Sequence, residues 1–274
     1  MAEVQLDSSF DAEMGTDDPI DVDGDGAGAI ENGAEEIDGD ALEEVDVEQR
    51  VSFFDYLQSP IVELLIGAGE HQTLLTAHQQ LLMRSPYFAD ICLRFGETST
   101  RRRIDLIDYD IDPVGCLLEF LYTGEYFPRK VDEGRLEDDP SVPAVDDSGE
   151  QLLKHARVYT LADKLGLDEL KTLAHSKIHR INSNAKGEIA YARFVYANTP
   201  REDTTIRKPV AAFWAHRSHV LRHEAEEEFR KMCLEFPQFG FDVLSLVLDA
   251  KEKAREKEHP GERSSRKRPR HSQV

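Results

Sequence analysis

The clearest hydrophobic pattern in the chain lies between Asp112 and Tyr126. Apolar residues recur there at spacings of three and four positions, which places them on one face of a helix. They are Val114, Leu117, Leu118, Phe120, Leu121 and Tyr122. A helix with so wide an apolar face must lie inside a core, where we expect Leu117, Leu118 and Leu121.

Both ends of this helix carry recognisable signals. Asp112 can act as an N-cap, and Pro113 suits the first helical turn. At the other end, Gly124 can adopt the left-handed conformation that ends a helix. The pattern therefore predicts a helix with defined limits, against which the neighbouring segments should pack.

The segments before this helix alternate between short strands and short helices. Ile61–Ile66 is predicted to be a buried strand, because an aliphatic run there ends at a glycine turn. Ser85 is a natural N-cap for one of the helices. The predicted elements are a helix over 51–57, strands over 61–66 and 72–76, helices over 78–84 and 86–93, and a strand over 104–107.

Residues 129–149 interrupt the pattern, because they are acidic, contain prolines and show no periodicity. We interpret them as an inserted loop. Helical periodicity resumes at Glu150 and stops at Gly166, and a second helix begins at Asp168. Residues 48–182 are thus predicted to form an α/β (α+β) domain, in which a small three-stranded sheet is flanked by a cluster of helices.

A C-terminal helical extension is predicted over residues 183–254. Its helices are expected at about residues 188–196, 207–223, 225–235 and 241–253. The extension carries nine aromatic residues between Tyr191 and Phe241, too many to leave in water. We expect them to pack together, against the last helices of the preceding domain. The alternative is that some of them stay exposed as a docking surface.

Charge is distributed very unevenly along the chain. Residues 1–50 contain 18 acidic side chains and one base, Arg50, so this segment carries −17 of the total net charge of −21. With few apolar residues to bury, residues 1–47 are predicted to be a disordered acidic tail. Asp21–Gly26 matches the start of a calcium-binding loop, but Asn32 stands where a bidentate Glu is needed. We therefore expect no calcium site.

Residues 255–274 are predicted to be a disordered basic tail. They contain the cluster Arg266, Lys267, Arg268 and Arg270, which is typical of a nuclear localisation signal. The alternative is a merely solvated tail. Specific nucleic-acid binding is not expected, because no aromatic stacking platform accompanies the cluster.

Three distant cysteines form no disulfide pattern, which favours a reducing compartment. We see neither a secretory signal nor an apolar run of about 20 residues, so no membrane association is expected. The location is predicted to be nuclear or cytoplasmic, with the nucleus favoured by the basic cluster.

Candidate chemistry is sparse. His216, His219 and His223 share a helix face, but a zinc site needs further ligands, and His is favourable near a helix end in any case. His175 and His179 lack the intervening Glu of a metalloprotease helix, so we interpret them as a solvated pair. No nucleophile or phosphate-binding motif appears. We therefore predict a protein that is not an enzyme and has no metal or cofactor.

Four motifs together resemble the BTB/POZ domain family, in particular the short form common in fungal proteins. They occur in the order and with the spacing that the family shows, and they cover about residues 50–181. The motifs are Arg84–Phe88, Ile104–Leu106, Leu117–Tyr126 and Val158–Leu165. Two positions depart from the family pattern. Ala77 stands where the family has His, with His78 one step late, and Pro60 replaces an Asp before the first strand.

The resemblance implies a non-enzymatic protein–protein interaction module, whose partners are other proteins or a second copy of itself. Phe53, Phe54 and Leu57 are the candidates for self-association. The strand that larger relatives exchange is replaced here by acidic sequence, so a swapped dimer is less expected than a monomer or a simpler dimer.

Two alternatives stay open. The first is a substrate adaptor of a cullin-type ubiquitin ligase, because Phe95-Gly-Glu97 is similar to the docking signature of such relatives, although it falls one residue early. The second is a nuclear transcription or chromatin-associated scaffold, suggested by the oppositely charged tails.

Overall fold

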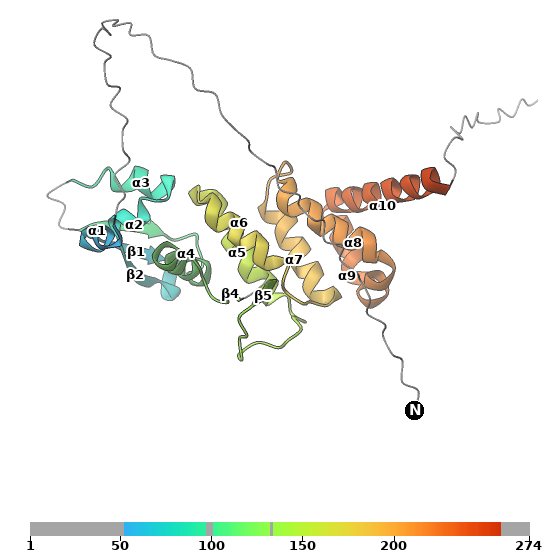
Figure 1. Ribbon diagram of the computed structural model, residues 1–274, viewed down its shortest axis with the longest axis horizontal. Helices are drawn as coiled ribbons and strands as arrows, with labels where there is room; N and C mark the ends of the chain where they lie inside the picture. The colour runs from blue at the N-terminus through green and yellow to red at the C-terminus, as the bar shows by residue number, and fades with distance from the viewer. Residues whose placement is uncertain (1–51, 97–100, 132–133, 259–274) are drawn as a thin grey trace, which may run out of the picture. The chain divides into compact units, whose positions relative to one another are not determined.

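The computed structural model of the protein describes residues 52–96, 101–131 and 134–258 (Figure 1). These residues belong to one compact unit of the chain. Several predictions fall outside them: the acidic tail, the calcium-like motif at Asp21–Gly26, the docking candidate Glu97 and the basic cluster at Arg266–Arg270.

A three-stranded sheet is organised around β1 (Ile61–Ile66), which lies between β2 (Thr73–His78) and β3 (Arg103–Leu106). β2 is antiparallel to β1 and β3 is parallel to it. Alternate residues of β1 are buried in the core, as the period of a strand requires. Gly67 and Gly69 have φ values of 77° and 65° in the turn that leads to the 3₁₀ helix η1 (Gly69–His71) and β2. β2 is longer than predicted.

Three short helices precede the central one: α1 (Phe53–Gln58), α2 (Gln79–Leu82) and α3 (Pro86–Cys92). The predicted N-cap of α3 is confirmed, because the Phe88 amide donates to Ser85 Oγ at 3.4 Å. Ser85 Oγ in turn donates to the Leu165 carbonyl at 2.6 Å. One serine therefore caps α3 and ties it to the end of α5.

The central helix α4 (Ile111–Thr123) ends as predicted, at Gly124 with φ 77°. Two predictions about it are wrong. The N-cap residue is Asp110, and Asp112 lies in the first turn. Leu117 and Leu121 are buried, but Leu118 is only half-buried, because it lies about 100° further round the helix, at the edge of the buried face.

Helices α5 (Glu150–Leu165) and α6 (Asp168–Ile178) follow, and α5 packs against α4, α6 and α7. Residues 129–149, which we interpret as an inserted loop, include two short strands. β4 (Lys130–Val131) and β5 (Arg135–Leu136) form a small antiparallel hairpin, and Asp146 is buried. Periodicity cannot reveal strands of two residues. Asp168 is not the N-cap of α6, since that position belongs to Leu167.

The extension consists of α7 (Ala185–Asn198), α8 (Thr204–Glu224), α9 (Glu226–Glu235) and α10 (Pro237–Glu258). Its aromatic residues pack together, as expected: the Trp214 ring centroid lies 5.2 Å from that of Phe229 and 6.2 Å from that of Phe239. Phe241 stays exposed. α10 continues to Glu258, so the predicted start of a disordered tail at 255 is wrong. The domain boundary at 182 stays a prediction.

The fold class is confirmed, because a small three-stranded sheet is combined with many helices. None of the helices within the described residues is long and apolar enough to cross a membrane.

Candidate interaction surfaces

Helix α1 presents the residues predicted for self-association. A capping box fixes its first turn: the Asp55 amide donates to Ser52 Oγ at 3.3 Å, and the Ser52 amide donates to the Asp55 carboxylate at 2.8 Å. Phe53, Phe54 and Leu57 are 51%, 64% and 42% exposed. No residue of α1 is buried. A rigid short helix thus carries large apolar side chains in water, which is typical of an interaction site.

Of the two docking candidates after α3, Phe95 lies among the described residues and Glu97 does not. Phe95 is half-buried and packs against the core, which leaves only part of its ring for a partner. Leu93, two residues earlier, is 74% exposed. The assignment of a docking site to Phe95 and Glu97 stays a prediction.

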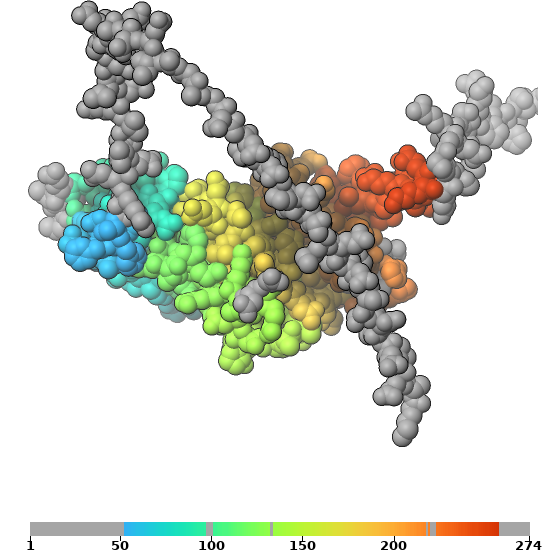
Figure 2. Space-filling model, in the orientation of Figure 1, coloured from blue at the N-terminus to red at the C-terminus, as the bar shows by residue number. Residues whose placement is uncertain are grey.

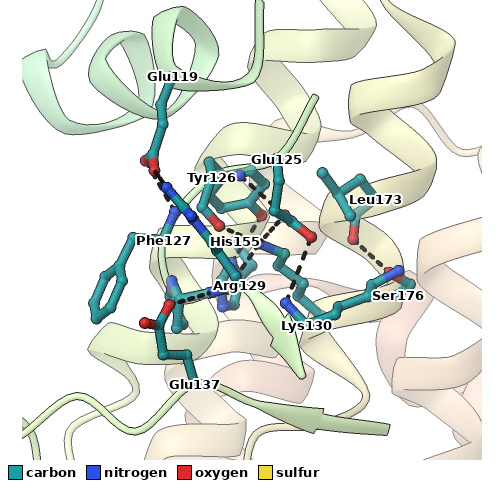
Figure 3. Close-up of polar contacts among 12 residues, drawn as sticks. Glu119, Glu125, Tyr126, Phe127, Arg129, Lys130, Glu137, His155, Leu173 and Ser176 are labelled. Atoms are coloured by element: carbon teal, nitrogen blue, oxygen red, sulfur yellow. Dashed lines mark hydrogen bonds and ion pairs between the residues drawn. The ribbon is translucent and has the colours of Figure 1, made fainter. Parts of the chain in front are cut away.

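The sequence pattern does not reveal a buried lysine, Lys177 in α6, which contacts Glu125 and Tyr126 (both labelled in Figure 3). Its amine lies 2.5 Å from a carboxylate oxygen of Glu125 and donates to the carbonyls of Tyr126 and Pro128, the latter at 2.7 Å. The amine also lies 3.7 Å from the centroid of the Tyr126 ring. One cation therefore holds the segment that follows α4 against α6.

The ionisable groups around Lys177 are shifted by burial. Burial lowers the pKa of Lys177, although Glu125 opposes this effect. Partial burial would raise the pKa of Glu125, but hydrogen bonds from Lys177 and from the Tyr126 amide hold it below its usual value. Burial lowers the pKa of His155 to about 3. His155 is thus neutral at neutral pH, with its Nδ1 2.8 Å from the Tyr126 hydroxyl.

Asp146 organises the N-terminus of α5. Its carboxylate accepts hydrogen bonds from the amides of Gly149, Gln151 and Leu152 at 2.8, 3.0 and 3.2 Å. A carboxylate near the first turn satisfies otherwise unpaired amides and interacts favourably with the helix dipole.

The backbone around Asp146 also contacts the start of α7. A Cβ atom on Gly187 would lie 2.7 Å from the Asp146 carbonyl oxygen and 2.2 Å from Ser183 Oγ, so this approach requires glycine. The predicted loop thereby joins α5 to α7.

Glu188, in the first turn of α7, should make stability depend on pH. Burial raises the pKa of Glu188 to about 7; Arg217 opposes the shift and Asp146 adds to it. Between about pH 4.5 and 7 the folded protein therefore binds more protons at this site than the unfolded chain. Stability contributed by Glu188 should fall as pH rises through this window, by at most about 3–4 kcal/mol.

The test compares urea unfolding of the wild type and Glu188→Gln from pH 5 to pH 8. The low pKa of His155 acts in the opposite direction below about pH 6.5, but it is present in both proteins. The difference between the two curves should therefore isolate Glu188. Parallel curves would show that Glu188 titrates normally.

A cavity of about 1060 Å³ opens between α4, the start of α5 and the segment 134–144. The yellow-green chain of this region projects from the surface in Figure 2. Its walls are partly apolar and its charges have both signs, with Glu150 paired to Arg157 at 3.4 Å. His155 lines the cavity but is held by Tyr126. The cavity is large enough for a ligand.

The histidine pairs and triplets form no metal centre. His216, His219 and His223 are exposed, and His216 Nδ1 lies 2.6 Å from the Ala212 carbonyl oxygen. His175 and His179 have Nε2 atoms 3.2 Å apart on α6. Within the described ranges, no group of three or more His, Cys, Asp and Glu side chains could hold a metal ion.

Comparison with known proteins agrees with this architecture. Residues 57–139 match the model of the BTB/POZ domain, which includes the sheet, α4 and the β4–β5 hairpin. No curated protein matches the chain. The resemblance to the short fungal form stays a prediction. Domains of this family bind other proteins and associate with themselves. The chain therefore contains a match to the BTB/POZ domain over residues 57–139, and domains of this family are modules for protein–protein interaction.

Proposed function

We propose that the protein works by self-association through α1, with Phe53, Phe54 and Leu57 at the centre of the contact. The observation that carries this proposal is the exposure of three large apolar side chains on one capped helix. Full burial of such a side chain contributes about 1.5–3 kcal/mol, so even part of this surface can support an interface.

The chemistry of α1 fits a second copy of the same surface. Asp55 is the only charged residue of α1, and its carboxylate is already bound to Ser52 in the capping box. Two copies of α1 can therefore meet through their apolar side chains, provided that both Asp55 carboxylates stay in water at the edge of the contact. A two-fold interface needs such a self-complementary surface. Self-association is also a property of the BTB/POZ family.

The test is light scattering coupled to size-exclusion chromatography of the full chain over a range of concentrations. Phe54→Glu places a charge in the proposed contact and should weaken self-association about 30-fold or more, as expected for a loss of about 2 kcal/mol at a central residue. Leu93→Glu is the matched control, because Leu93 is exposed in a different part of the domain.

If Phe54→Glu and Leu93→Glu have the same effect on mass, the contact does not lie on α1. Circular dichroism should confirm that both variants keep the helical content of the wild type. The adaptor and nuclear-scaffold alternatives are not favoured by any contact among the described residues and stay predictions.

A further inference from the structure

Helix α10 presents a second exposed apolar surface, far from α1 in the sequence. Phe241, Leu244 and Leu248 are 64%, 55% and 50% exposed. Their spacing of three and four residues places them on one face of the helix, which we call the α10 stripe. The opposite face is used by the fold, because Phe239 and Val243 are buried and α10 packs against α8 and α9.

The second half of α10 has few contacts. Every residue from Leu248 to Lys257 is exposed. Figure 1 shows this part of α10 extending past α8 and α9. This half of α10 is therefore accessible to another molecule along its whole length.

The α10 stripe continues into two basic residues. Lys251 and Arg255 follow Leu248 at the same alternating spacing, so they lie on the same face of the helix as the apolar residues. Both are exposed and neither takes part in a hydrogen bond or ion pair among the described residues. The surface is thus apolar at one end and basic at the other.

We propose that the α10 stripe pairs antiparallel with the α10 stripe of a second copy of this chain. In the antiparallel register Leu244 faces Leu248 of the second copy, and Leu248 faces its Leu244. Phe241 then faces Lys251 of the second copy, whose amine can lie over the aromatic ring. Phe241, Leu244, Leu248 and Lys251 each therefore face a suitable side chain of the second copy, and the two copies are related by one two-fold axis.

The charges decide the orientation. A parallel pair would place Lys251 against Lys251 and Arg255 against Arg255, which is repulsive. An acidic amphipathic helix of another protein could also cover the stripe. The second copy is favoured, because the stripe matches itself without bringing like charges together.

The α10 contact is separate from the α1 contact, so four forms of the full chain distinguish them. They are the wild type, Phe54→Glu, the double variant Leu244→Glu/Leu248→Glu, and all three changes together. With α1 disabled by Phe54→Glu, the protein should still have twice the mass of one chain by light scattering. Adding Leu244→Glu/Leu248→Glu should then halve this mass.

The control in the Phe54→Glu background is Lys253→Glu. It changes the net charge by the same amount as the double variant but lies on α10 away from the stripe. If Leu244→Glu/Leu248→Glu has no more effect than Lys253→Glu, or if Phe54→Glu alone is already monomeric, the α10 proposal is wrong. If Phe54→Glu leaves the mass of the wild type unchanged, the α1 proposal fails instead.

Cross-linking tests the orientation. In the antiparallel register, Phe241→Cys and Lys251→Cys proteins should form a mixed disulfide, whereas Lys251→Cys alone should not, because ten residues along the axis separate the two sites by about 15 Å. Self-cross-linking of Lys251→Cys would show a parallel pair. The wild type is the control, because it shows whether the native cysteines Cys92, Cys116 and Cys233 form cross-links by themselves. Cys92 and Cys116 are buried.

Discussion

Replacing Lys177 with methionine should lower the free energy of unfolding by about 3–5 kcal/mol. The substitution keeps most of the volume of the side chain but removes its charge. The carbonyl of Tyr126 then loses its buried donor, and Glu125 loses its ion-pair partner at 2.5 Å. Unpaired buried acceptors and charges account for the size of this effect. Because the Glu125 side chain is 23% exposed and can recover some hydration, we expect the lower end of the range.

Urea unfolding at neutral pH measures this cost, and two further variants define its origin. Arg193→Met removes the partner of Glu235 from a half-exposed ion pair and should cost under about 1 kcal/mol. The double variant Lys177→Met/Glu125→Gln leaves no unpaired charge and should be less destabilised than the sum of its single changes. Additive single changes would mean that the ion pair contributes nothing beyond the bonds to the carbonyls.

The sequence was sufficient for the elements whose signals are local. Ser85, Gly124 and Gly166 each act through their own backbone position, and the helix ends they predict are found there. β1 is bounded by a proline and a glycine, and its limits agree with the prediction. These signals depend on the local backbone conformation and not on tertiary contacts with the rest of the chain.

Long-range polar contacts could not be predicted in the same way. The burial of Lys177 was not expected, because lysine is rarely buried. Its position does carry a signal: it lies three residues after Ala174, on the face that also holds Leu170. The burial of Asp146 depends on Ser183 and Gly187, which are far along the chain. Because residues 129–149 are acidic in composition, the sequence offers no sign that Asp146 is buried.

The two candidate interaction surfaces, on α1 and α10, also differ in how much of them the sequence predicts. The hydrophobic pattern predicts the helix that carries Phe53, Phe54 and Leu57, and the resemblance alone suggests their role in self-association; the structure adds that all three are exposed. Exposure of Phe241 is one of the alternatives that the sequence leaves open, whereas that of Leu244 and Leu248 was not expected, because the hydrophobic pattern does not show which side of α10 packs. Periodicity identifies an apolar face but does not say whether this chain or another one covers it.

Leu117→Ala and Leu118→Ala, adjacent changes of the same size in α4, should have clearly different effects on stability. Leu117 is 0% exposed in the core, so its truncation leaves a cavity and should cost about 2–5 kcal/mol. Leu118 packs only at the edge of the core. Water or neighbouring side chains can fill part of the space it leaves, so we expect a cost of about 1–2 kcal/mol.

Thermal unfolding of both variants tests this assignment, since each kcal/mol should lower the midpoint by about 2–4 °C for a domain of this size. Each protein serves as the control for the other, because helix propensity changes equally at the two positions. Equal midpoints would mean that α4 is rotated relative to the core described here. Neither variant should alter self-association under conditions where it remains folded, because Leu117 and Leu118 lie on neither α1 nor α10. A loss of self-association in a folded Leu118→Ala protein would instead place part of the interface on α4.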